Sequence, residues 1–371
     1  MRVAIVFGGR SSEHEISLRS ALTVIRALDP AHELFAVGIT RAGRWRYLPE
    51  PATTLEPIVA GRGQLPEHAG IATDLVAADE GGVRVANSPS PSPIDVVFPV
   101  LHGSFGEDGT IQGLLEMKGV PYVGSGVLGS AIGMDKAIQK RLLAAAGVPV
   151  VEFHSLRRQE YERDPQSAPV LARELGYPVF IKPNALGSSI GMSRVTSEEA
   201  LHGAIEYAFR YDRAVLIEAA CSGREFECAV LGNDEPQASL PGEVIVSSSH
   251  DFYSYESKYL DENGANYAIP AHLPAPIVER IQAWSCAAFQ ALRLRGMARV
   301  DFLASADLGR LVVGEVNTIP GFTSISMYPK LWEVSGLPLP SLLDRLIELA
   351  LQEHRERQRL TVDYLPSGRA V

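Results

Sequence analysis

The sequence predicts an α/β protein with an N-terminal doubly wound parallel-sheet domain followed by two α+β domains. Its 371 residues correspond to two or three domains of ordinary size. The chain opens with a strand pattern at residues 3–7, a glycine-rich turn, a helical pattern and a second strand at residues 34–40, which is typical of a doubly wound unit. Strand and helix patterns then alternate in two further units, so we expect domains at residues 1–128, 129–218 and 219–371.

The first domain carries recognisable local signals. Ser12 and Glu15 match a capping box at the start of the first helix. Residues 49–93 are rich in proline, glycine and alanine, and predict a loose insertion with a small hairpin around residues 83–86. The next buried strand ends at His102, where a side chain either lines a ligand crevice or is an ordinary loop residue, because ligands of open α/β sheets bind beyond the carboxyl ends of the strands.

The second and third domains are each expected to hold several strands and helices. One helix should cover residues 130–146 and end at Gly147, a residue suited to the position after a helix. Residues 241–270 have little apolar periodicity, and a long irregular segment inside a compact domain is often a functional lid. The other expected elements are strands at residues 150–154, 179–182, 214–218, 225–231, 299–304 and 311–317, and helices at residues 197–209, 276–294 and 337–353.

Charge and composition argue against several classes of function. The formal net charge is −10, which disfavours a broad nucleic-acid footprint and means that a phosphate site must gather its cations locally. No apolar run approaches the roughly 18 residues that a membrane helix needs. No signal peptide is visible either, so we expect a cytoplasmic protein without a membrane partner. Cys221, Cys228 and Cys286 lack metal-site spacing and are expected to be structural thiols.

Two strands of the third domain carry polar side chains inside apolar surroundings. Arg299 and Asp301 share one face of their strand, and Glu315 and Asn317 share one face of the next, because alternate residues of a strand point the same way. If the strands pair, Asp301, Glu315 and Asn317 form an all-oxygen cluster that suits a hard cation such as Mg²⁺. A buried ion pair between Arg299 and a carboxylate explains the pattern equally well.

A second candidate is Lys182, which ends a strand and precedes a small-residue loop at residues 187–191. Backbone N–H groups of such loops can cradle phosphate beside a lysine, although an ordinary hairpin with a solvated lysine has the same spacing. Glu13 and Glu15 stand at a helix start, where acids often only complement the helix dipole. Lys258 and Tyr259, in the irregular segment, have a solvated loop face as their default interpretation.

Taken together, the segments resemble D-alanine–D-alanine ligases of the ATP-grasp superfamily. Each motif alone is weak, but their order and spacing are highly specific, and only residues 49–93 match poorly. The motifs are Gly8-Gly9-Arg10-Ser11-Ser12-Glu13-His14-Glu15-Ile16-Ser17-Leu18, Leu101-His102-Gly103-Ser104-Phe105-Gly106-Glu107-Asp108-Gly109, Pro121-Tyr122-Val123-Gly124-Ser125-Gly126, Gly133-Met134-Asp135-Lys136, Ile181-Lys182-Pro183-Asn184-Ala185-Leu186-Gly187-Ser188-Ser189-Ile190-Gly191, Tyr255-Glu256-Ser257-Lys258-Tyr259, Arg299-Val300-Asp301-Phe302 and Glu315-Val316-Asn317-Thr318-Ile319-Pro320-Gly321-Phe322-Thr323.

The resemblance implies a three-domain ATP-grasp architecture whose second and third domains clasp ATP. It implies that ATP is a substrate, that two Mg²⁺ ions are bound, which Mn²⁺ could replace, and that the protein is a homodimer. The ATP residues it implies are Lys136, Lys182 and Ser189 for the phosphates, Glu218, Ala219 and Cys221 for adenine, and Glu225 for the ribose. The metal ligands it implies are Asp301, Glu315 and Asn317.

The resemblance also implies two D-alanine sites and a reaction for peptidoglycan precursor synthesis. The first D-alanine carboxylate attacks the γ-phosphate of ATP, and the second D-alanine amine attacks the resulting acyl phosphate. Closure by residues 241–270 would protect this intermediate from water. The residues implied are Glu13, His102 and Ser188 for the first D-alanine, Lys258, Ser326 and Met327 for the second, Arg299 and Gly321 for the oxyanion, and Tyr259 for linking the lid to the first site.

Three alternatives remain open. The product could be D-Ala-D-Ser or D-Ala-D-lactate, although Tyr259 argues against lactate. The chain could be another carboxylate–amine ligase of the ATP-grasp superfamily. It could also be an inactive nucleotide-binding regulator, against which the complete set of phosphate and metal residues argues.

Overall fold

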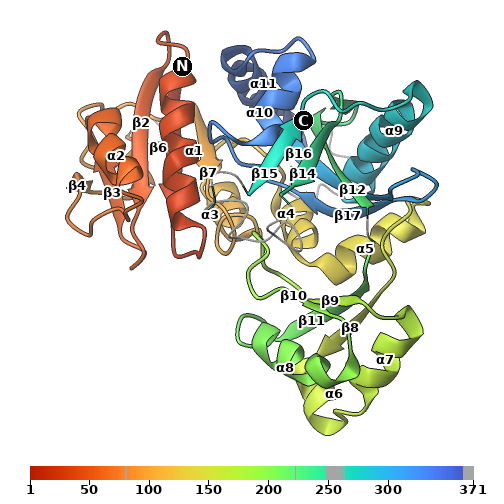
Figure 1. Ribbon diagram of the computed structural model, residues 1–371. Helices are drawn as coiled ribbons and strands as arrows, with labels where there is room; N and C mark the ends of the chain where they lie inside the picture. The colour runs from red at the N-terminus through yellow and green to blue at the C-terminus, as the bar shows by residue number, and fades with distance from the viewer. Residues whose placement is uncertain (80–81, 222, 248–260, 262–263, 362–371) are drawn as a thin grey trace, which may run out of the picture.

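The chain forms a mixed α/β fold with several sheets in the computed structural model, which describes residues 1–79, 82–221, 223–247, 261 and 264–361 (Figure 1). The first sheet contains three parallel strands extended by two antiparallel ones. Helices α1 (His14–Ala27) and α3 (Thr110–Met117) belong to this part of the chain. The strands, in spatial order, are β4 (Ile71–Ala72), β3 (Trp45–Leu48), β2 (Glu33–Ile39), β1 (Arg2–Gly8) and β7 (Val96–Val100).

The insertion at residues 49–93 is more ordered than its composition predicts. The expected hairpin is confirmed as the antiparallel pair β5 (Leu75–Ala77) and β6 (Val83–Val85). The expectation of a loose segment is wrong, because α2 (Pro51–Ala60) packs Leu55 into the core beside α1. A proline at the first helical position suits a helix start, which the composition argument overlooked.

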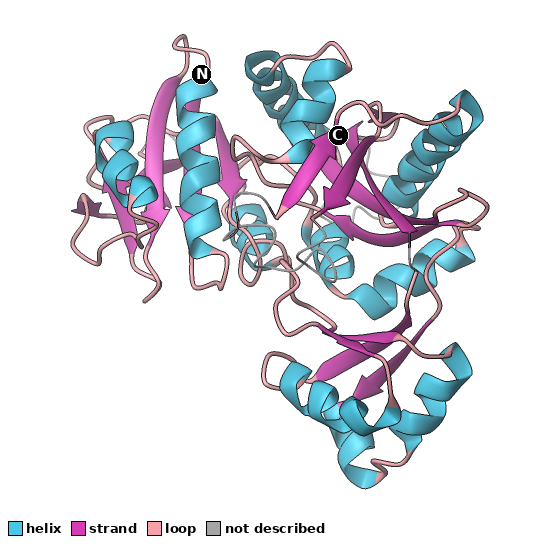
Figure 2. Ribbon diagram, in the orientation of Figure 1, coloured by secondary structure: helices cyan, strands magenta, loops and turns pink. Residues whose placement is uncertain are grey.

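The second sheet is antiparallel and is covered by helices on one face (Figure 2). Loop 184–192 joins β9 to β10 at one edge of this sheet. Its strands, in spatial order, are β10 (Ser193–Val195), β9 (Val179–Pro183), β11 (Ala214–Ala219) and β8 (Phe153–Arg157). Its helices are α6 (Arg158–Arg163), α7 (Ser167–Leu175) and α8 (Glu198–Ala208).

The third sheet lies between two helical layers. Alternate residues of β12 point to opposite faces, so Phe226, Cys228 and Val230 pack with α9, whereas Ala229 and Leu231 pack with α10 and α11. The strands in spatial order are β15 (Ala265–Ala268), β14 (Gly242–Val246), β12 (Gly223–Gly232), β16 (Gly296–Ser305) and β17 (Leu311–Asn317), with β13 (Gln237–Ala238) also paired to β12. The helices are α9 (Ala275–Ala291), α10 (Met327–Val334) and α11 (Leu339–Gln358).

The single helix expected over residues 130–146 is wrong, because two helices meet at Asp135. Helix α4 (Val127–Met134) ends there, and the extended backbone of Asp135 lets its carboxylate accept the N–H of Ile138 and cap α5 (Lys136–Ala145). After this break, α5 lies between the second sheet and β17 (Figure 1).

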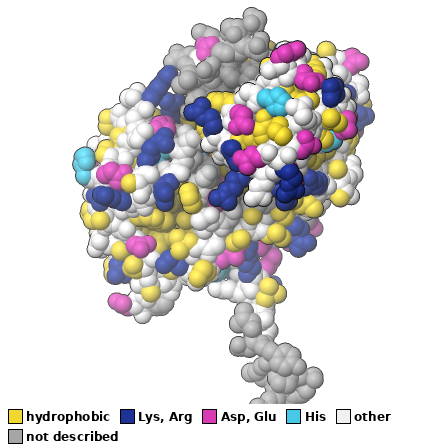
Figure 3. All heavy atoms as spheres, turned by 90° about the horizontal axis from the view of Figure 1, so that it is seen from below, with side chains coloured by type: hydrophobic (Ala, Val, Ile, Leu, Met, Phe, Trp, Pro, Cys, Tyr) yellow, Lys and Arg dark blue, Asp and Glu magenta, His cyan; other side chains and the backbone are white. Residues whose placement is uncertain are grey.

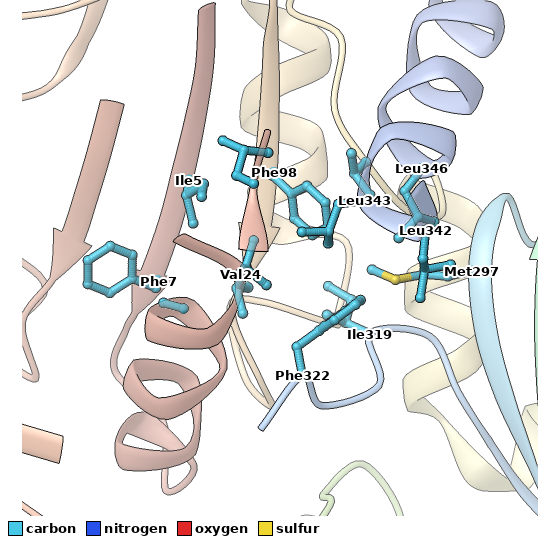
Figure 4. Packing of buried hydrophobic residues seen from close by; sticks show 14 of the residues in the cluster. Ile5, Phe7, Val24, Phe98, Met297, Ile319, Phe322, Leu342, Leu343 and Leu346 are labelled. Carbon is cyan, nitrogen blue, oxygen red and sulfur yellow. The ribbon is translucent and has the colours of Figure 1, made fainter. Parts of the chain in front are cut away.

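The largest core joins the first sheet to the third. Residues 319–322 lie between the two, and Phe322 makes an edge-to-face contact with Phe98 at 6.0 Å between ring centroids (Figure 4). Met297 of β16 and Leu342 of α11 belong to the same cluster. Because this core spans the chain from β1 to α11, it fixes the carboxyl end of β7 against the loop after β17.

The surface carries charges of both signs. On the face seen from below, basic side chains are interspersed with acidic and apolar ones (Figure 3). Within the described ranges, none of the helices is long and apolar enough to cross a bilayer.

Candidate active site

A cavity of about 100 Å³ opens where the three sheets meet. It is lined by the ends of β7 and β17, by the start of α5 and by loop 184–192, which come from distant parts of the chain. Ten of the residues predicted for the site line it, namely Glu13, His102, Lys136, Ser188, Arg299, Glu315, Asn317, Gly321, Ser326 and Met327.

Glu13 lies in a buried corner of this cavity. It is only 7% exposed, and its Oε1 accepts the hydroxyl hydrogen of Ser188 from across the cavity. Its Oε2 accepts no hydrogen bond from any side chain or backbone group that the structure describes. Burial, together with the negative charge of Glu107, raises the pKa of Glu13. A cationic group entering this corner would therefore be strongly favoured.

The predicted capping box is wrong, since Glu13 rather than Ser12 occupies the N-cap position and no side chain caps α1. Ser11 Oγ instead accepts the N–H of Glu13 at 3.0 Å, and Glu15 forms a salt bridge with Arg41 at 2.7 Å. The helix-dipole interpretation does not describe Glu13, because its carboxylate accepts a hydrogen bond from Ser188 in loop 184–192.

His102 is buried at the end of β7 rather than being an exposed loop residue. Its Nε2 lies 3.1 Å from Ser20 Oγ and its Nδ1 lies 3.1 Å from the carbonyl oxygen of Ile319. Burial alone would lower the pKa of His102, but Glu107, at 3.7 Å, and Glu13 raise it. Glu107 was missed as a site residue, although it stands in the motif that begins at Leu101.

Three carboxylates face one another across β12, β16 and β17. The register pairs Glu227 with Asp301 and Asp301 with Glu315. Arg299 neutralises part of this row, with Nη2 at 2.6 Å from Asp301 and Nε at 3.0 Å from Glu227. The expected strand pairing and the Arg299–Asp301 ion pair are therefore both confirmed. Glu227 was missed, although it alternates with Glu225 along the strand.

This row fits a hard divalent cation. Opposed carboxylates repel each other unless cations separate them, and Lys136 lies 3.3 Å from Glu315. Asn317, paired with Arg299 in the register, adds an amide oxygen next to the row. In the described chain no three His, Cys, Asp or Glu side chains form a metal cluster by themselves. Mg²⁺, however, commonly takes only one or two protein carboxylates and completes its shell with substrate phosphates and water.

Lys182 is not a solvated hairpin lysine. Its Nζ lies 2.5 Å from Glu218 Oε2, and Lys140 lies 3.1 Å from Glu218 Oε1, so one carboxylate bridges two lysines. These charges lower the pKa of Glu218 against the opposing effect of burial, and Glu218 and Glu315 raise that of Lys182. Lys140 is fully buried and was missed, because a lysine inside a helical pattern gives no sign of its environment.

Loop 184–192 brings its small residues against the acidic corner. Ser188 and Ser189 both have left-handed backbones, with φ of 54° and 56°, a conformation that is uncommon for residues other than glycine and concentrates at functional sites. A Cβ on Gly187 would lie 3.1 Å from Glu13 Oε2, so glycine permits this approach. Lys136 donates to the carbonyl of Leu186 at 2.8 Å and ties the loop to α5.

The loop after β17 forms the opposite wall. Ser326 Oγ accepts the N–H of Thr323 at 3.0 Å, and a Cβ on Gly321 would lie 2.7 Å from that oxygen. Of the irregular segment 241–270, the two ends form β14 and β15, where strands were not expected. Lys258 and Tyr259 lie outside the described residues.

The remaining predicted nucleotide residues lie on neighbouring elements rather than on the cavity wall. Asp301 forms an ion pair with Arg299, which lines the cavity, and Lys182 forms an ion pair with Glu218. The others are Ser189 beside Ser188, Ala219 at the end of β11, Cys221 after it and Glu225 on β12.

Comparison with known proteins decides the family. A family model described as the N-terminus of D-ala D-ala ligase matches residues 2–125, and one described as the C-terminus matches residues 142–348. The chain belongs to the D-alanine–D-alanine ligase family. It is 46% identical to D-alanine–D-alanine ligase A of Chromobacterium violaceum over 363 residues, which cover 97% of this chain and 98% of that protein.

Solved structures of this family have the same fold. The D-alanine–D-alanine ligase from Coxiella burnetii superposes with a TM-score of 0.81 at 36% identity, covering 97% of this chain and 96% of that one. The VanG D-Ala:D-Ser ligase from Enterococcus faecalis also has a TM-score of 0.81, at 35% identity, covering 94% of this chain and 99% of that one. Members of this family are ATP-dependent ligases of small-molecule substrates, so the chain is an enzyme that uses ATP.

Proposed function

We propose that this protein joins two D-alanines into D-alanyl-D-alanine for peptidoglycan precursor synthesis, with conversion of ATP to ADP and phosphate. One observation carries the proposal: a single cavity combines an acidic corner at Glu13 with Glu315 and with the cations Lys136 and Arg299. Asp301 is opposite Glu315 in the strand register and forms an ion pair with Arg299 at the edge of this cavity. The first feature suits an amino group, and the second suits a metal–phosphate group. A ligase that activates an amino acid with ATP needs both side by side.

Binding of the first D-alanine is assigned to the buried corner. Glu13 holds the substrate ammonium with its free Oε2, and Ser188 keeps the carboxylate of Glu13 in place. His102 supports the same corner through its contacts with Glu107 and the Ile319 carbonyl. In this assignment the substrate carboxylate points toward Lys136, which also lines the cavity.

For ATP, we assign Lys136, Lys182 and Ser189 to the phosphates, and the end of β11 to adenine. Asp301, Glu315 and Asn317 would hold two Mg²⁺ ions, or Mn²⁺ in their place, which supply charge neutralisation of the transferring phosphate. The further nucleotide residues in this assignment are Glu218, Ala219 and Cys221 for adenine and Glu225 for the ribose.

The chemical steps need positioning and charge stabilisation rather than an enzyme nucleophile. The carboxylate of the first D-alanine attacks the γ-phosphorus, which gives an acyl phosphate and ADP. The amine of the second D-alanine then attacks the acyl carbon, and phosphate leaves. Arg299 and the N–H of Gly321 stabilise the tetrahedral oxyanion. The carboxylate of the second D-alanine is held by Lys258, Ser326 and Met327. Tyr259 links the lid, residues 241–270, to the first D-alanine site.

Several broader assignments accompany this function. We propose ATP-grasp domains at residues 1–128, 129–218 and 219–371, since each range contributes its own sheet or sheets. We also propose a homodimer that works in the cytoplasm, where ATP is supplied.

The test is phosphate release from ATP and Mg²⁺ with each substrate in turn. D-alanine alone should give phosphate and a dipeptide, and L-alanine should give neither. Equal turnover with L-alanine would reject the assignment. D-serine offered beside D-alanine tests the second candidate, a D-Ala-D-Ser ligase, which the likeness to the Enterococcus faecalis enzyme keeps in view.

A further inference from the structure

Strand β17 contains a bulge next to the proposed metal ligand Glu315. The register pairs Asp301 with Glu315 and Phe302 with Val313, so Gly314 is an extra residue without a partner in β16. A bulge turns the neighbouring side chain to a new direction and locally disrupts strand pairing. The direction of Glu315 therefore depends on what holds the backbone around Gly314.

A fully buried lysine holds this bulge. Lys140 Nζ donates to the carbonyl oxygen of Gly314 at 2.6 Å and pairs with Glu218 at 3.1 Å. Glu218 in turn pairs with Lys182. One ammonium group thus connects the backbone beside Glu315 with the carboxylate that holds the proposed phosphate lysine.

Gln139, the residue before Lys140 in α5, holds the backbone of β17 on the other side of Glu315, at Val316. β17 is an edge strand, and an edge strand presents N–H and C=O groups that lack a strand partner. Here the Gln139 amide takes that place, because its Oε1 accepts the Val316 N–H at 2.9 Å and its Nε2 donates to the Val316 carbonyl at 2.9 Å. Gln139 also donates to Gly133 at 2.7 Å and is fully buried.

The contacts follow from helical geometry. Positions 136, 139 and 140 are three and four residues apart, so they share one face of α5. That face meets β17 at three consecutive residues: Lys140 at Gly314, Lys136 at Glu315 and Gln139 at Val316.

We propose that Gln139 and Lys140 are positioning residues that set the orientation of Glu315 for metal binding. They act on the peptide groups at 314 and 316, and neither side chain lines the cavity. The inference rests on the proposed function, because it takes Glu315 as a metal ligand. A purely structural role would lower stability when either side chain is lost but would leave metal affinity intact.

The experiment measures Mn²⁺ binding to the full chain in the presence of ADP, from the paramagnetic resonance signal of free Mn²⁺, together with the Mg²⁺ concentration that half-saturates phosphate release. The variants are Lys140→Met and Gln139→Met, which keep a flexible side chain of similar size and lose the hydrogen bonds. We expect both metal measurements to weaken about 10- to 100-fold, the usual effect of removing a group that orients a metal ligand.

The matched control is Asn233→Ala. Asn233 is also buried and also bridges two elements, accepting the N–H of Gly296 at 3.2 Å and donating to the carbonyl of Leu349 at 3.1 Å, away from the proposed metal ligands. It should lose thermal stability and keep wild-type metal affinity.

Lys140→Met leaves Glu218 with one lysine instead of two, and the variant could fail to fold. Gln139→Met then decides the question, because it removes no charge. Unchanged metal affinity in Gln139→Met, with a lowered melting temperature like that of the control, would overturn the proposal. Absence of D-alanine-dependent phosphate release by the wild type would instead count against the proposed function, and Mn²⁺ binding is measured independently of that release.

Discussion

Replacing Glu13 by glutamine should weaken the first substrate site and stabilise the free protein at the same time. The change keeps the size of the side chain and the acceptor for Ser188, but removes the charge that faces the substrate ammonium. A hydrogen bond to a charged group contributes about 1.5–3 kcal/mol. At about 1.4 kcal/mol per tenfold, the KM of the first D-alanine should rise roughly 10- to 150-fold.

The stability change has the opposite sign. The pKa of Glu13 is raised in the folded protein, chiefly by burial, so the folded state resists ionisation more than the unfolded chain does. Stability from this group is therefore present at acid pH and is lost as the pH rises through the folded pKa. At neutral pH the wild type has lost this part of its free energy of unfolding, whereas glutamine does not ionise and does not lose it. The melting temperature of the ligand-free variant should therefore be higher than that of the wild type.

The assays are initial rates against D-alanine at saturating ATP and thermal unfolding without ligand. Glu15→Gln is the matched control, because Glu15 is the neighbouring acid of the same helix start but pairs with Arg41. It should keep the wild-type KM and lose stability. A Glu13→Gln variant with wild-type KM and a lowered melting temperature would refute the assignment of Glu13 to the substrate.

Four further predictions concern three proposed site residues and the buried His14. Glu315→Gln should fold but lose most turnover at limiting Mg²⁺, as measured by phosphate release. Lys182→Ala should weaken ATP binding by about 1.5–3 kcal/mol, and unchanged affinity by calorimetry would reject its role. Burial lowers the pKa of His14, whose Nε2 accepts the N–H of Leu65, so the free energy of unfolding should fall as the pH drops below about 6.5. Urea unfolding of His14→Gln should lack that part of the pH dependence. Tyr259→Lys should shift the second site from D-alanine toward D-lactate, most clearly at lower pH, and a product mixture identical to that of the wild type would contradict it.

The local sequence pattern was sufficient to predict β16 and β17, the strands that carry the proposed metal ligands. It was insufficient to predict the residues that surround these strands. Alternation alone placed Arg299 and Asp301 on one face, and Glu315 and Asn317 on another, and the register confirms that these faces meet. The bulge at Gly314 could not be predicted, because a register shift depends on the partner strand and on α5 rather than on the residues of β17.

Residues buried by distant contacts were equally invisible. Lys140 in a helical pattern is ordinarily a surface residue, and only the folded chain shows that Glu218 and Gly314 surround its ammonium group. The helix break at Asp135 had a local signal, since Asp is a common N-cap residue, but the apolar periodicity on both sides concealed it. Errors of this kind are tertiary effects that overrule a correct local preference.

The two interpretations of the acidic and basic residues, as structural ion pairs and as a nucleotide site, are compatible. In the free protein each cation proposed for phosphate or oxyanion binding contacts a carboxylate proposed for metal or nucleotide: Lys136 with Glu315, Arg299 with Asp301, and Lys182 with Glu218. Buried charges are costly unless they are paired, so this pairing lets the site exist without ligand. A metal–nucleotide carries both signs of charge and would replace both partners of the Lys136–Glu315 pair, with phosphate taking the lysine and metal taking the carboxylate. When phosphate draws Lys182 away, Glu218 keeps its pair with Lys140, and when metal draws Asp301 away, Arg299 keeps its pair with Glu227. Under the proposed function, the charges of these three pairs are therefore compensated with and without ligand, which is how an acidic protein would keep a pre-formed phosphate site.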